Sequence, residues 1–305
     1  MDRLRIPNIA TYLPIAPSDL LLAAPLAARI LFGASPAGRA LQVAALGVYA
    51  GSAAIDWAIR ADARRVDFEE AFGFDPLRPP PASEKDRLGD VERLVARLND
   101  NYLPMRTPRK ELAEQVDLRL TDFLAELTGQ RLETSAQVRD FMLAQIVFPF
   151  ALGAADPLTG DVAIFRSTGV FEPHVIAHEF CHRKGYLKEV EAQILGYLAL
   201  ADSGEPVLEQ SAFCERLDRQ LWVLADRDAA AYNEMLVDAG LREELRAAFE
   251  LRHPNEGGLA GVVGPIMKNA YDARMKFTGQ NGLSDYDEGF TNFLLAIERE
   301  PVEGT

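Results

Sequence analysis

Two histidines four residues apart, with a glutamate directly after the first, form the part of this sequence best suited to chemistry. They are His178, Glu179 and His182, in the order His-Glu-Phe-Cys-His. Residues four apart lie on the same face of an α-helix, so both imidazoles can reach one metal ion. Glu179 projects about 100° further round the helix, where its carboxylate can take a proton from a water beside that ion. The pattern therefore predicts a site for one Zn²⁺ ion that supports hydrolysis.

Histidine is scarce in this chain, which holds only four in 305 residues. A chance match to the pattern is expected in fewer than about one such sequence in a hundred. Upstream, Pro173 suits a first helical turn, and downstream Gly185 suits a helix end. A second helical pattern begins near Lys188 and runs to Leu200. The sequence predicts a metal-binding helix, a tight glycine break and a second helix.

A catalytic zinc site generally takes three protein ligands and a water, so a third ligand must come from elsewhere. The main candidates are Glu189 and Glu191, with Glu172 and His174 as further ones. We favour Glu189 because it begins a run similar to the E-x-x-A-[D/N] signature of glutamate-liganded zinc peptidases, the gluzincins. The position where metzincins carry a third histidine holds Lys188. The helix dipole alone also favours a carboxylate at a helix N-terminus, which is the alternative explanation for either glutamate.

Three further side chains are candidates for supporting roles in the site. His174 lies one helical turn before His178 and can support a ligand, face the substrate or be an ordinary helix-surface histidine. Tyr286 and Tyr271 are candidate donors to an oxyanion, with two core tyrosines as the plainer alternative.

The composition is that of a folded protein that is a poor partner for nucleic acid. Hydrophobic residues make up 48% of the chain and charged residues 26%, and the net charge is −14. Phosphate contact needs clustered Lys and Arg, and no basic stripe or phosphate-binding glycine motif is present. A peptide or protein is the substrate class that the motif favours, and the oligomeric state is left open.

The first 66 residues differ from the rest and are predicted to form an Ala-rich helical hairpin. The stretch 20–33 is apolar except for Arg29, and the stretch 40–55 carries no charge. One interpretation is a membrane hairpin, flanked by Arg3 and Arg5 at one end and by Arg60, Arg64 and Arg65 at the other. The positive-inside rule then places both ends and the following domain in the cytoplasm. The other is a pair of buried helices that pack on a soluble cytoplasmic protein.

Residues 67–305 are predicted to form one metallopeptidase domain. Apolar residues at helical spacing predict helices near 87–100 and 108–127, and the chain is predicted to be helical from 205 onward. Short apolar runs at 146–150 and 162–165 predict strands just before the histidine motif. In zincin peptidases an edge strand at this place pairs with an extended substrate. The fold class expected is α+β, mainly α with a small β-sheet, built around a zincin-like core.

The chain resembles the bacterial domain-of-unknown-function family 3810. That family carries an HExxH-x-x-G segment followed by E-x-E-A-N, and this chain has His178 to Gly185 followed by Glu189–Gln193, with Gln193 in place of the asparagine. Further similarities lie in four shorter stretches, Pro17–Leu21, Asp156–Gly160, Tyr271–Lys276 and Gly282–Tyr286.

The resemblance implies a membrane-anchored, gluzincin-like zinc metallopeptidase of unknown substrate, held at the inner membrane of a bacterial cell. Two other classes of protein stay open as alternatives. One is a zinc protein in which the metal only staples two helices together, and the other is a membrane-associated interaction protein in which the histidine motif is incidental.

Overall fold

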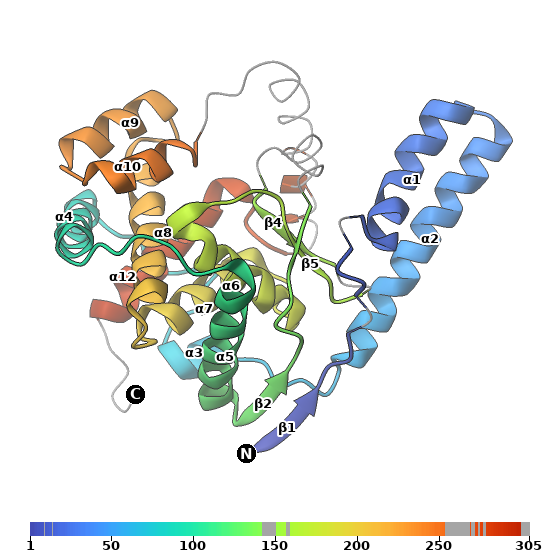
Figure 1. Cartoon of the computed structure of the whole chain (residues 1–305), viewed down its shortest axis with the longest axis horizontal. Helices are drawn as coiled ribbons and strands as arrows, with labels where there is room; N and C mark the ends of the chain where they lie inside the picture. Colours follow the sequence, from blue (N-terminus) through green and yellow to red (C-terminus); the bar gives the residue numbers. More distant parts are fainter. Residues whose placement is uncertain are drawn as a thin grey trace.

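Figure 1 shows the chain as a computed structural model in which a body of packed helices carries a separate helical hairpin. The structure describes residues 1–299 except 9, 14, 142–150, 157–158, 254–268, 270–271, 274 and 277–278. The predicted strand at 146–150 and the candidate Tyr271 therefore lie outside the described residues.

The described elements confirm a mainly helical chain with small sheets. In chain order they are β1 (Asp2–Arg5), α1 (Pro17–Phe32), α2 (Pro36–Ile59), α3 (Phe68–Phe72), α4 (Glu84–Asp100), α5 (Arg109–Thr128), β2 (Gln130–Glu133), β3 (Arg139–Asp140), β4 (Gly153–Ala155), β5 (Val162–Ile164), the 3-10 helix η2 (Gly169–Phe171), α6 (Glu172–Arg183), α7 (Glu189–Ala201), α8 (Pro206–Leu224), α9 (Ala229–Asp238), α10 (Glu243–Glu250) and α12 (Leu283–Arg299).

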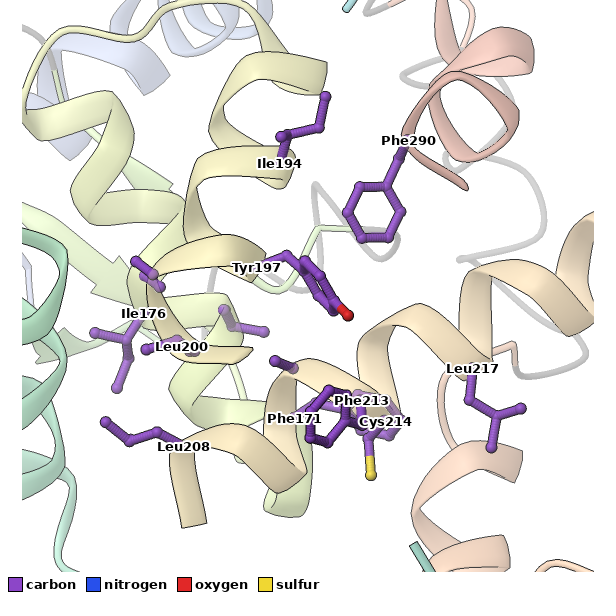
Figure 2. Close-up of a cluster of buried hydrophobic side chains, with 14 of the residues drawn as sticks. Phe171, Ile176, Ile194, Tyr197, Leu200, Leu208, Phe213, Cys214, Leu217 and Phe290 are labelled. Carbon is purple, nitrogen blue, oxygen red and sulfur yellow. The ribbon is translucent and has the colours of Figure 1, made fainter. Parts of the chain in front are cut away.

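The core lies where α6, α7, α8 and α12 pack on one another, with α4 and α5 on its outside. The middle of this set is α8, whose residues are buried on nearly every side. Figure 2 shows the apolar side chains that meet there, which include Ile176, Ile194, Tyr197, Leu200, Leu208, Phe213, Leu217 and Phe290. Because α6 and α7 are fixed on this core, the groups they carry have defined positions.

Two small sheets complete the body. In the three-stranded sheet the order is β3-β5-β4, with β3 parallel and β4 antiparallel to β5. The central strand, β5, corresponds to the strand predicted at 162–165. A second sheet joins the first residues of the chain to the middle, since β1 pairs with β2 in parallel, Asp2 opposite Gln130. The sequence did not predict this pairing, because it joins segments more than a hundred residues apart.

The predicted N-terminal hairpin is present, with α1 and α2 packed mainly on each other and extending away from the body (Figure 1). Large apolar side chains on both helices are exposed, among them Ile30, Leu31, Val43, Leu46 and Ile55. The interpretation in which these helices are buried is therefore wrong for these side chains. Among the described residues, no helix combines the length and apolar character needed to cross a bilayer.

Candidate metal centre

The histidine motif lies within α6, and the chain leaves this helix through a sharp turn. Gly185 adopts φ of +96°, a left-handed conformation that glycine reaches without strain. The N–H of Tyr186 donates to the carbonyl of Cys181 at 3.0 Å, which satisfies a carbonyl of the last helical turn. The chain then reverses into α7, whose first residue is Glu189. The turn brings the start of α7 back beside the two histidines.

Three side-chain atoms from the two helices form a nearly equilateral triangle. Nε2 of His178 and Nε2 of His182 are 3.1 Å apart. Oε2 of Glu189 lies 3.2 Å from the first nitrogen and 3.4 Å from the second. Ligands held at 2.0–2.1 Å from a tetrahedral zinc ion are separated by about 3.3 Å. The triangle thus has the dimensions of one face of such a coordination shell, and the three residues could hold a metal ion.

A hydrogen bond orients the second histidine for this role. Nδ1 of His182 lies 2.7 Å from the backbone carbonyl of Tyr186. A carbonyl only accepts, so Nδ1 carries the proton and donates it. When the ring is neutral, as it is when it binds a metal, the lone pair of Nε2 is then directed at the triangle. This is the tautomer that a hydrogen bond at Nδ1 selects in metal-binding histidines. The turn after α6 therefore fixes both the position and the protonation pattern of His182.

Mutual electrostatics keep the carboxylate of the triangle ionised. Burial disfavours the charged form of Glu189, but His182 and His178 outweigh it and hold the pKa of Glu189 well below its ordinary value. Burial likewise disfavours the imidazolium of His182, but the Glu189 carboxylate outweighs it and raises the pKa of His182 to about 9. The N–H of Glu189 donates to Oε1 of Gln280 at 2.8 Å, which satisfies one free donor at the start of α7.

Glu179 lies beside the triangle and packs against β4. A Cβ at Gly153 would lie only 3.0 Å from Cγ and Oε1 of Glu179, so a larger residue there would require Glu179 or the strand to shift. Burial raises the pKa of Glu179 above its ordinary value, although His178 and His182 partly oppose that shift. A carboxylate with a raised pKa next to a metal-ligand set is suited to accept and return a proton near neutral pH.

The other predicted ligands are engaged elsewhere. The Glu191 carboxylate forms an ion pair with Lys188 at 2.7 Å. Glu172 is bound by Arg109, whose Nε donates to Oε1 at 2.6 Å. The structure therefore brings Glu189, and neither of these two, to the histidines.

Two of the predicted supporting residues, His174 and Tyr286, contact side chains of the core. His174 is fully buried, its Nδ1 is 3.7 Å from Oε2 of Glu215, and burial lowers the pKa of His174 to about 4. It therefore does not face solvent, as an ordinary helix-surface histidine does. Tyr286 donates its hydroxyl to Oε1 of Gln193 at 2.6 Å, which links α12 to α7. Each residue therefore connects a helix of the site with a neighbouring helix, His174 of α6 with α8 and Tyr286 of α12 with α7.

Two arginines that follow the hairpin hold the end of α6. Arg60 donates from Nε and Nη2 to the carbonyl of Arg183, at 3.0 and 2.8 Å. Arg65 donates from Nη1 to the carbonyl of Lys184 at 2.7 Å, and its guanidinium lies over the Tyr186 ring. The sequence interpretation treated these arginines as membrane flanks, and no local pattern relates them to residues 120 positions away. We call Arg60 and Arg65 the arginine clamp.

Removing the arginine clamp is expected to weaken metal binding through the turn that orients His182. In Arg60→Met/Arg65→Met we expect about 10- to 100-fold weaker Zn²⁺ affinity, the range seen when a group that supports a ligand is lost. Competition with a chelating dye measures this. Arg64→Met is the matched control, because Arg64 is exposed and pairs with Asp2 instead. Equal affinities for the double variant and wild type would contradict the role of the clamp.

Comparison with known proteins places the site within a recognised family. The model of a family described as "Protein of unknown function (DUF3810)" matches residues 76–295, more than two thirds of the chain. The matched region includes α6, α7 and β4, whereas the hairpin and the arginine clamp precede it. Searches of curated proteins and of solved structures found no match. The chain belongs to the DUF3810 family of proteins of unknown function.

Proposed function

We propose that this protein is a zinc-dependent peptidase with a gluzincin-like ligand set in a zincin-like core. The observation that carries the proposal is the triangle of His178, His182 and Glu189, with sides of 3.1 to 3.4 Å, next to a separate buried carboxylate. Two imidazoles and one carboxylate are the ligand set of a well-known class of catalytic zinc site, in which the fourth position is open to water. Glu179 is the separate carboxylate.

In the proposed reaction the protein groups hold, orient and move protons. Zinc bound at the triangle would lower the pKa of a water molecule and, as a Lewis acid, would polarise the scissile carbonyl. Glu179 takes a proton from the attacking water and delivers it to the leaving amine. Its raised pKa suits both steps, because the group must accept a proton and then release it.

The edge strand β4 supports an extended peptide as substrate. Among the described strands, β4 pairs with β5 on one side only, and its Gly153 packs on Glu179. A peptide that adds to the open edge by main-chain hydrogen bonds would run past the proposed base. Because residue 153 is glycine, β4 lies close to Glu179. A peptide paired with β4 would therefore have its scissile bond near both the proposed base and the metal ligands.

A peptide-library digest and a metal analysis together test the proposal. We expect purified protein to contain about one zinc per chain, and to cleave peptides only when no chelator is present. Stoichiometric zinc without cleavage of any peptide would indicate the alternative function, a metal-stapled interaction protein. Cleavage that persists after the metal has been removed would contradict the zinc mechanism.

We also propose that the hairpin associates with lipid. Exposed large apolar side chains lie along α1 and α2, a placement that water disfavours and a bilayer interface favours. Each such side chain that enters an apolar phase contributes about 1.5–3 kcal/mol.

Vesicle flotation tests the lipid proposal. We expect the full chain to float with phosphatidylcholine vesicles, and Leu31→Glu/Val43→Glu to lose at least about tenfold in bound fraction. The matched control is Leu118→Glu, at an exposed leucine of α5, which should float like wild type. Equal flotation of the hairpin variant and the control would argue against the hairpin as the lipid-binding element.

A further inference from the structure

Arg166, which follows β5, is a cation for which the described residues supply no counter-ion. It is half-buried, and it makes no hydrogen bond or ion pair with any residue in the described part of the chain. Burial, and then the neighbouring Arg252, lower the pKa of Arg166. A desolvated guanidinium without a partner is costly, and this chain carries 14 more acidic than basic charges from which a partner could have come.

The carboxylates that contact Arg252 also bind other groups. Arg252 forms ion pairs with Glu215 at 2.8 Å and with Asp218 at 3.2 Å. Glu215 also accepts from Arg219 at 2.8 Å, and Asp218 from the hydroxyl of Tyr232 at 2.6 Å. Both carboxylates are fully buried on α8. The network therefore neutralises Arg252, and no carboxylate in the part of the chain that the structure describes pairs with Arg166.

The position of Arg166 relates it to the metal centre. The N–H of Phe165 donates to the carbonyl of Leu152 at 2.9 Å, so Arg166 follows directly on the last residue joined to the β4 side. Two residues earlier, Ile164 pairs with Gly153, the glycine that packs on Glu179. Two residues span at most about 7 Å of extended chain. An arginine side chain at this place can reach a peptide residue one or two positions from the bond that would be cleaved.

We infer that Arg166 is a specificity-determining residue that binds a carboxylate of the peptide substrate. Guanidinium and carboxylate form paired, charge-assisted hydrogen bonds. The substrate carboxylate would therefore supply the counter-ion that the described residues do not. The carboxylate belongs either to an acidic side chain or to the C-terminus of the peptide. This inference rests on the proposed peptidase function, and it extends that function to a substrate class.

Peptides that differ only in charge test the inference. The set shares one cleaved sequence and places Glu or Gln at each position around the scissile bond, with a free or an amidated C-terminus. We expect wild type to prefer one acidic member by about 10- to 100-fold in kcat/KM, and Arg166→Gln to lose that preference while it cleaves the neutral peptides unchanged. Arg166→Glu should instead favour an additional peptide that carries Lys at that position. The position of the preferred acid distinguishes a side chain from a C-terminus.

Two controls separate this inference from the function on which it rests. Arg119→Gln removes an equal charge from an arginine that pairs with Glu205, and should keep the wild-type preference. Arg166→Gln should not lower the melting temperature, because an unpaired cation is removed. If wild type cleaves nothing, the peptidase proposal fails, and binding of fluorescent Glu and Gln peptides to Glu179→Gln protein with Zn²⁺ still tests Arg166. Equal discrimination by wild type and Arg166→Gln, in cleavage or in binding, overturns the inference.

Discussion

Replacing Glu179 by Gln is expected to lower peptidase activity by about 10²- to 10⁴-fold while zinc content stays at the wild-type level. The amide has nearly the same shape as the carboxylate but cannot accept a proton, so the loss is that of a general base. Glu179 is not part of the ligand triangle, and the metal should therefore be retained. The measurements are kcat/KM on the best library peptide and zinc content by elemental analysis.

The same change also separates a catalytic role from a structural one. Glu179 packs on Gly153, so a distorted strand would alter the melting temperature together with activity. We expect the melting temperature to change little, because the glutamine fills the same space. Activity near the wild-type level in Glu179→Gln would eliminate this carboxylate as the base, and loss of zinc would indicate that it acts as a ligand.

The second large effect is expected from the pair Glu189→Gln and Glu191→Gln. The first should weaken Zn²⁺ binding by more than about 100-fold, beyond the range typical of a group that only supports a ligand. The second should bind zinc like wild type, since Glu191 is engaged with Lys188. The two positions share one helix and one chemistry, so each variant is the control of the other. Isothermal titration of metal-free protein with Zn²⁺ measures the difference.

The reverse outcome has a clear meaning. If Glu191→Gln loses zinc and Glu189→Gln keeps it, the start of α7 rotates when the metal binds, and the ligand triangle does not represent the bound state. If neither variant loses zinc, the metal is held by other groups and the proposed coordination fails.

Local sequence patterns predicted much of the fold. Helical spacing predicted α4, α5 and α7, which the structure contains at Glu84–Asp100, Arg109–Thr128 and Glu189–Ala201. The apolar run at 162–165 predicted β5, and the Ala-rich runs predicted the hairpin. These predictions succeeded because periodicity and chain breakers act over a few residues. The pairing of β1 with β2, and the contact of the arginine clamp with α6, join segments far apart and have no local pattern.

The candidate site likewise has features that local sequence determines and features that depend on contacts between distant segments. The sequence alone determined that two imidazoles and a carboxylate share one helical turn or so, because the helix repeat fixes which residues meet. Only the tertiary structure decided that Glu189, and not Glu191, completes the triangle, since that depends on how the turn at Gly185 aims α7. It also decided that β4 touches Glu179 and that Arg166 has no counter-ion among the described residues, because packing and charge pairing depend on contacts between distant segments.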